Sequence, residues 1–154
     1  MSDVLPLIEE SIETSAPPVR AWATVSDLGR MSTWSPQVVR TFVHSRPIAL
    51  GTRMTNINRR GPLFWPTRTK VVRFEPHREV AFRVKDNFTI WSFTLEPTAT
   101  GGIRITQRRE APDGISSISR VLTTRVLGGI PQFQDELRAG MRQTLQRIKA
   151  ELER

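Results

Sequence analysis

A short stretch near the N-terminus constrains the fold of this chain more than any other feature. Apolar and polar residues alternate over Val4–Thr14, as they do in a strand with one solvated face. Pro17 and Pro18 end this strand. Pro18 suits the first turn of a helix, because its missing N–H group would have no backbone partner there. The stretch therefore predicts a strand that leads directly into a helix.

A second short helix is expected soon after the first. Asp27 is a residue type favoured at an N-cap, and it precedes the expected helix over Leu28–Thr33. Trp34-Ser35-Pro36 then ends this helix, because the residue before a proline is pushed out of the α-helical region. Two short helices are thus expected between the first strand and the rest of the chain.

The middle of the chain is expected to consist of short strands. Turn-forming residues such as Gly61-Pro62 and Asp86-Asn87 separate segments of alternating polarity. The six expected strands are Gln37–Ser45, Thr52–Arg59, Thr67–Phe74, Glu79–Lys85, Thr89–Glu96 and Ile103–Glu110. Short strands joined by tight turns favour an antiparallel meander.

The last part of the chain changes to a helical period. Apolar residues at helical spacing, one stripe of an amphipathic helix, predict a helix over Pro131–Glu153; they are Phe133, Leu137, Met141, Leu145, Ile148 and Leu152. Before it, Ile118–Leu127 is expected to form a shorter helical piece. Gly128-Gly129 would be a joint that lets this piece move as a lid.

Length and composition predict one globular domain, residues 1–154, long enough to bury a core. The chain has no cysteine, which excludes disulfides, thiolate catalysis and cysteine-ligated metals. No window has the ~18 consecutive apolar residues of a membrane span. Acidic Asp3, Glu9 and Glu10 stand where a signal peptide would be basic, so a cytoplasmic protein is expected.

The chain is basic, with a formal net charge of +8 from 23 basic and 15 acidic residues. Such a balance could favour nucleic acid, an anionic membrane surface or an acidic partner. The arginines are scattered along nearly every expected element and form no basic run, which favours a solvated, arginine-rich outer sheet face. No specific nucleic acid is therefore expected. A transient membrane contact stays open, as does the choice between a monomer and a homodimer.

Several short motifs together resemble a known family. They are Ala16-Pro17-Pro18-Val19 with Trp22, Asp27-Leu28 with Trp34-Ser35-Pro36, Gly51-Thr52-Arg53, Glu75-Pro76-His77-Arg78, Trp91-Ser92-Phe93-Thr94-Leu95 and the helix from Gly140 to Lys149. In their order, the chain resembles the polyketide cyclase/dehydrase and lipid-transport family of the START-like (SRPBCC) superfamily. The resemblance covers almost the whole chain. It implies an α+β helix-grip fold, in which a curved antiparallel sheet of about seven strands is joined by two short helices after the first strand and a long C-terminal helix.

The resemblance also implies an apolar cavity between sheet and helix. The first functional hypothesis is therefore binding or transport of a small hydrophobic ligand, such as a lipid, fatty acid, quinone or polyketide-like molecule, with no cofactor and no metal. The alternative is an enzyme of the polyketide cyclase/dehydratase type. The third is a basic interaction module for RNA, the ribosome or an anionic membrane. The fold by itself does not choose among them.

Ten residues are expected to face the cavity and bind the ligand. They combine large apolar side chains with one amide, the composition typical of small-molecule pockets; they are Trp34, Met54, Asn56, Trp65, Phe82, Trp91, Phe93, Phe133, Leu137 and Met141. Any of the apolar ones could instead be an ordinary core residue, because aromatic residues and methionine commonly fill cores. Asn58 and Gln107 are further polar candidates.

Three residues are candidates for acid or base catalysis: Arg109, His44 and Glu10. Arg109 shares strand parity with inward residues and could meet an anionic or carbonyl oxygen, although a solvated strand end is the interpretation we favour. His44 shares the parity of Val38 and Phe42 and could act as a base only if it reaches the cavity. Cyclising aromatases of the family tend to use tyrosine with arginine, and this chain has no tyrosine.

Overall fold

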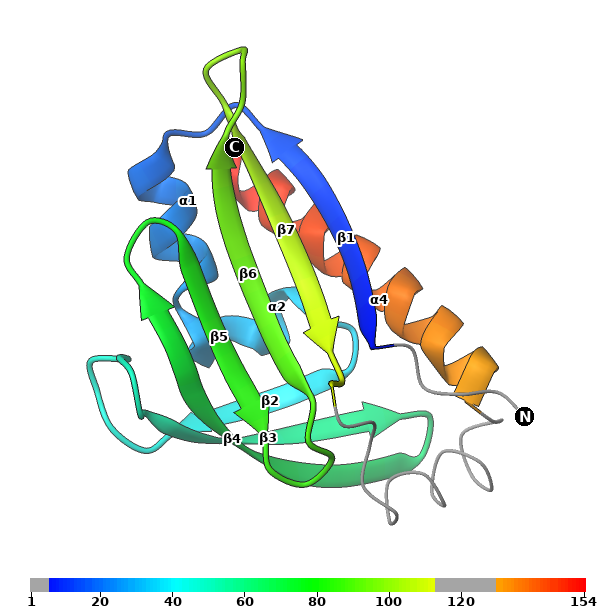
Figure 1. Ribbon diagram of the computed structural model, residues 1–154. Coiled ribbons are helices and arrows are strands. Elements are labelled where there is room, and N and C mark those ends of the chain that lie inside the picture. Colours follow the sequence, from blue (N-terminus) through cyan, green and yellow to red (C-terminus); the bar gives the residue numbers. More distant parts are fainter. Residues whose placement is uncertain (1–5, 113–129) are drawn as a thin grey trace.

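The computed structural model describes residues 6–112 and 130–154 (Figure 1). The strands are β1 (Leu7–Thr14), β2 (Val38–Val43), β3 (Arg53–Arg60), β4 (Leu63–Glu75), β5 (Glu79–Val84), β6 (Ile90–Pro97) and β7 (Ile103–Glu110). The helices are α1 (Pro18–Val25), the 3-10 helix η1 (Leu28–Arg30), α2 (Met31–Trp34) and α4 (Ile130–Leu152). The expected helical piece over residues 118–127 and the joint at 128–129 lie outside the described residues.

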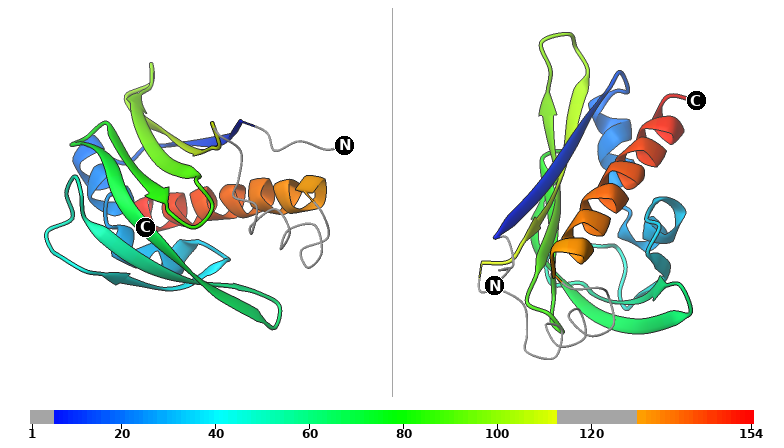
Figure 2. Two further views of the ribbon diagram at one scale, coloured as in Figure 1. Left: turned by 60° about the horizontal axis from the view of Figure 1, so that its bottom comes forward. Right: turned by 90° about the vertical axis from the view of Figure 1, so that its right-hand side faces the viewer.

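The seven strands form one antiparallel sheet in the order β1-β7-β6-β5-β4-β3-β2. Strands that follow one another in sequence are neighbours from β2 to β7, while β1 pairs with β7. Figure 2 shows that the sheet is curved and that α4 runs along its concave side, where the short helices also lie. The predicted α+β helix-grip fold is therefore confirmed.

Two local predictions were wrong. β4 begins at Leu63, four residues before the expected start, because Gly61 adopts a φ of 58° and turns the chain so tightly that Arg60 pairs with Leu63. Asp27 is not a side-chain N-cap; its carbonyl instead accepts a hydrogen bond from the Arg30 N–H at 3.0 Å, which begins a 3-10 turn.

A β-bulge in β2 changes the direction of the side chains that follow it. Val38 pairs with Asn58, but Arg40 already pairs with Ile57, so Val39 is the extra residue. Val38 therefore points to the concave side of the sheet, whereas Phe42 points to the outer side. The expectation that these two residues share a face was wrong for this reason.

The core lies between the concave face of the sheet and the helices. On α4, the residues of the predicted stripe from Met141 to Leu152 are at most 2% exposed. Phe133 and Leu137, nearer the start of the same helix, are only half-buried. The C-terminal part of the stripe therefore packs in the core, whereas its N-terminal part forms the wall of a cavity. Within the described ranges, no helix combines the length and hydropathy that a membrane span requires.

Candidate functional site

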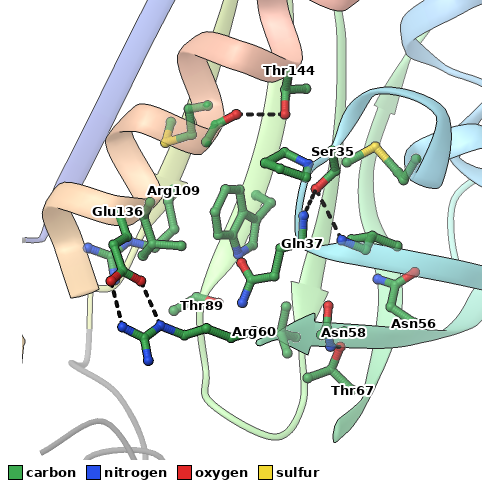
Figure 3. Close-up of a pocket in the computed structure, with 18 of the residues that line it drawn as sticks. Ser35, Gln37, Asn56, Asn58, Arg60, Thr67, Thr89, Arg109, Glu136 and Thr144 are labelled. Atoms are coloured by element: carbon green, nitrogen blue, oxygen red, sulfur yellow. Dashed lines mark hydrogen bonds and ion pairs between the residues drawn. The ribbon is translucent and has the colours of Figure 1, made fainter. Parts of the chain in front are cut away.

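A cavity of about 320 Å³ lies between α4 and the concave face of the sheet (Figure 3). This volume is at the lower end of the range of about 300–1,000 Å³ that small-molecule pockets occupy. Strands β2 to β7, the loop before β2, and helices α2 and α4 supply its lining. The cavity therefore depends on segments from almost the full length of the chain.

Much of the cavity wall is apolar. Its apolar side chains come from both the sheet and α4; they are Met31, Val38, Trp65, Phe82, Val84, Trp91, Phe133, Leu137 and Met141. On the strands, inward direction follows from alternation, as for Phe82 and Val84 two residues apart on β5. This wall can bind the apolar part of a ligand by removing it from water.

Two asparagines on β3 add hydrogen-bonding groups to the wall. Asn56 and Asn58 are both buried and lie two residues apart, so both point to the cavity. Thr41 Oγ1 donates to Asn56 Oδ1 at 2.6 Å, and Asn58 Nδ2 donates to Thr67 Oγ1 at 3.0 Å. These bonds orient the two amides. The Nδ2 of Asn56 and the Oδ1 of Asn58 form no hydrogen bond with the described residues.

The most unusual part of the wall is on β7. Gln107 and Arg109 each line the cavity and are each only 3% exposed. Gln107 Oε1 is buried and accepts no hydrogen bond from the described residues. Desolvation by burial lowers the pKa of Arg109 to about 10, so the guanidinium is still protonated at neutral pH. The cavity thus holds a protonated guanidinium and, two residues away on the same strand, an amide oxygen that accepts no hydrogen bond within the described part of the chain.

An ion pair links the sheet to α4 at the edge of the cavity. Arg60 on β3 binds Glu136 on α4 through two hydrogen bonds, with Nη2–Oε1 and Nε–Oε2 distances of 2.6 and 2.8 Å (Figure 3). The side chains of both residues are partly exposed. Hydrogen bonds from Arg60 lower the pKa of Glu136, because they favour its charged form.

The structure brings seven of the ten predicted ligand-binding residues to the cavity wall: Asn56, Trp65, Phe82, Trp91, Phe133, Leu137 and Met141. The other three, Trp34, Met54 and Phe93, are at most 2% exposed and belong to the core instead. They face inward as expected, but at positions where helices pack directly on the sheet. Ligand contact by the seven stays a prediction.

The three catalytic candidates have three different surroundings. Arg109 is buried at the cavity, so the interpretation as a solvated strand end was wrong; its register partners Ile8 and Trp91 flank it on both neighbouring strands. His44 follows the β2 bulge and lies on the outer face, where its Nε2 is 2.9 Å from Thr55 Oγ1. Glu10 does not line the cavity.

Glu10 instead joins β1 to α4. Its carboxylate accepts hydrogen bonds from Arg138 and Arg142, each at 2.7 Å. Burial acts to raise the pKa of Glu10, but the two arginines outweigh it, so the pKa is lowered. The role that the structure gives Glu10 is therefore to hold the helix to the edge strand.

Several lining residues were missed by sequence reasoning, namely Ser35, Gln37, Arg60, Thr89, Glu136 and Thr144. Thr144 follows Met141 by three residues, so helical spacing could have indicated it. Ser35 Oγ accepts hydrogen bonds from the N–H groups of Gln37 and Val38 at 3.3 and 3.4 Å, which shapes the loop before β2. The pairing of Arg60 with Glu136 has no sequence signal, because the two residues are far apart in the chain.

A curved sheet that closes on a long helix around a largely apolar cavity defines the helix-grip class of ligand-binding folds. This chain belongs to the family described as polyketide cyclase/dehydrase and lipid transport, which it matches over residues 6–153. The family and the fold support a hydrophobic ligand-binding fold. A comparison with curated protein sequences finds no match.

Solved structures share this fold. A polyketide cyclase-like protein from Corynebacterium glutamicum is 26% identical, with a TM-score of 0.62 over 96% of this chain and 91% of that one. A protein from Mycobacterium smegmatis is 16% identical, with a TM-score of 0.66 over 96% and 91% of the two chains. The di-domain aromatase/cyclase StfQ of the steffimycin biosynthetic pathway is 15% identical, with a TM-score of 0.73 over 98% of this chain and 51% of that one.

Proposed function

We propose that this protein binds a small hydrophobic molecule with an acidic head group, such as a fatty acid or a polyketide-like acid. The observation that carries the proposal is Arg109, a protonated side chain that is 3% exposed and lines a largely apolar cavity. A cation in a largely apolar cavity wall attracts an anion more strongly than a solvated cation does, because little water screens the charge. A carboxylate bound in the cavity would form charge-assisted hydrogen bonds with Arg109.

The other lining residues fit such a ligand. Its apolar body would pack on Phe82, Trp91 and Met141, and burial of apolar surface would supply affinity. Its head group would accept hydrogen bonds from Arg109, and a protonated or hydroxylated head could also donate to Gln107 Oε1. Charge-assisted hydrogen bonds are stronger than neutral ones, and more so away from water. One end of the ligand would therefore be selected by charge and the other by shape.

A cyclase or dehydratase is the second candidate, because Arg109 could also stabilise negative charge that develops on a carbonyl oxygen. Such a reaction further needs a group that accepts or donates a proton. Among the described lining residues the only carboxylate is Glu136, and it is bound to Arg60 with a lowered pKa, which makes it a weak base. This arrangement favours binding over catalysis.

Calorimetric titration with decanoic acid and with decanol tests the proposal, because these probes share an alkyl chain and differ in head-group charge. We expect the wild-type protein to prefer the acid. R109M should bind the acid about 10- to 100-fold more weakly, as expected when a hydrogen bond to a charged group is lost, and should lose the preference. R108M removes the same charge from the opposite face and should behave like wild type. Equal affinity of R109M and wild type for the acid, or no uptake of either probe, would refute the proposal.

A further inference from the structure

One continuous part of the chain has basic residues but no acidic ones. No acidic residue occurs between Asp27 and Glu75. Nine basic residues do occur there, namely Arg30, Arg40, Arg46, Arg53, Arg59, Arg60, Arg68, Lys70 and Arg73. This segment includes β2, β3 and nearly all of β4, which are consecutive at one edge of the sheet. Four of the nine form ion pairs with carboxylates from other parts of the chain, namely Arg30, Arg60, Arg68 and Arg73. The other five form no ion pair with a carboxylate of the described residues; they are Arg40, Arg46, Arg53, Arg59 and Lys70.

Three cations form a row across the outer face of the sheet. Arg53 on β3 is directly opposite Lys70 on β4, and Lys70 is directly opposite Arg83 on β5. Met54, next to Arg53, is in the core on the concave side, so the row points to the outer side. All three side chains are exposed, and none forms an ion pair with a carboxylate of the described residues. We call Arg53, Lys70 and Arg83 the basic row.

The basic row is locally unfavourable, because like charges directly opposite each other destabilise a sheet. The other half of the same face avoids this cost by alternating charge. There Arg108 binds Glu9 at 2.8 Å, and Arg104 lies 3.7 Å from Glu13. Local rules that a protein breaks without compensation are expected at functional sites. An anionic partner of the basic row would provide the missing compensation.

Exposed apolar side chains accompany these cations. Arginines lie over three partly exposed rings, with guanidinium-to-centroid distances of 4.7 Å for Arg40 on Phe42, 5.3 Å for Arg59 on Phe64 and 5.7 Å for Arg83 on Phe88. Leu50, in the connection between β2 and β3, is 68% exposed. Cations beside exposed aromatic and aliphatic groups suit the boundary between lipid head groups and acyl chains.

We propose that the outer face of β2 to β5, centred on the basic row, docks on anionic phospholipid membranes. The basic row would approach the phosphates, while Phe42 and Phe88 would enter the head-group region. A nucleic acid could use the cations and the rings, but it would give the exposed Leu50 no favourable contact, so the membrane is favoured. This inference is independent of the cavity's ligand, although a membrane is where hydrophobic ligands are found.

Vesicle sedimentation with the full chain tests the proposal. The vesicles are phosphatidylcholine alone, or an equimolar mixture of phosphatidylcholine and phosphatidylglycerol. We expect binding to the mixed vesicles only, weakening as salt is added. The test variant is R53Q/K70Q/R83Q. The matched control, R78Q/R104Q/K149Q, removes two arginines and one lysine that form ion pairs elsewhere on the surface.

The basic-row variant should bind the mixed vesicles on the order of 100-fold more weakly, about fivefold for each charge removed. The control variant should stay within a few-fold of wild type. Because repulsion within the basic row is relieved, the basic-row variant should melt no lower than wild type. If the triple variant does not fold, K70Q alone should bind the mixed vesicles about fivefold more weakly than wild type. Three results would each overturn the proposal: no binding of wild type to mixed vesicles at low salt, equal weakening of both triple variants, or binding to single-stranded RNA without binding to vesicles.

Discussion

Replacement of Arg109 by methionine should stabilise the protein while it removes the proposed anion site. Burial lowers the pKa of Arg109 well below the ordinary value of an arginine, to about 10. At 1.36 kcal/mol per pKa unit, the folded state carries a penalty of about 3 kcal/mol for the charged form. A methionine is uncharged, so its burial carries no such penalty, and its side chain keeps apolar contacts in the cavity wall. We therefore expect R109M to be more stable by up to about 3 kcal/mol, which for a domain of this size raises Tm by roughly 6–12 °C.

The pH dependence of this effect follows from the direction of the shift. A cation whose pKa is lowered on folding destabilises the folded state at every pH below the folded value. The penalty disappears only as pH rises from about 10 towards the ordinary pKa of an arginine. The stability difference between R109M and wild type should therefore be constant across mildly acidic and neutral pH. Any change with pH in that range would have to come from another group.

Chemical denaturation of the ligand-free proteins measures the difference. The control is R108M, since Arg108 is the neighbouring residue on the outer face and donates to Glu9 at 2.8 Å and to Thr94 at 2.7 Å. Loss of these partly exposed contacts should cost up to about 1 kcal/mol. Our reasoning is refuted if R109M is no more stable than wild type, because burial of Arg109 would then be fully compensated within the protein.

Two further predictions concern α4. Ile148 is 0% exposed in the core, so I148A should lose about 2–5 kcal/mol of stability in urea titrations, and a loss below 1 kcal/mol would contradict the packing described here. Glu10 has a lowered pKa in the folded state despite the opposing effect of burial, because Arg142 and Arg138 hydrogen-bond to its carboxylate. Its stabilisation is present above the unfolded pKa and is lost as pH falls through the folded pKa. E10Q should therefore be less stable by about 1 kcal/mol at neutral pH, and urea titrations should show the difference vanishing in acid; a difference that persists there would count against the two arginine contacts.

Sequence patterns predicted the elements well where a single local rule acts. The alternation in β7 predicted Ile103–Glu110, and these are the observed bounds. The expected bounds failed where two rules competed. Gly61-Pro62 was expected to separate two strands, the second of them starting at Thr67, yet the turn at Gly61 lets pairing resume at Leu63, and β4 carries Pro66 within it.

The candidate site was only partly predictable, for two physical reasons. Strand parity indicates which side of a sheet a residue faces, but one extra residue reverses it, and the bulge at Val39 moved His44 to the outer face. Strand parity also does not indicate whether the space in front of an inward side chain is filled by other residues or left as a cavity. Phe82 and Phe93 both face inward, and only Phe82 lines the cavity.

The sequence by itself determined the order of the elements and the apolar stripe of α4, because hydrophobic periodicity and turn residues act over a few positions. Only the tertiary structure decided which inward residues form a cavity, since that depends on how far α4 stands from the sheet along its length. It likewise decided the surroundings of the charges. Arg109 is buried because β1 and β6 flank it, and Arg53, Lys70 and Arg83 meet because strand register places them opposite one another.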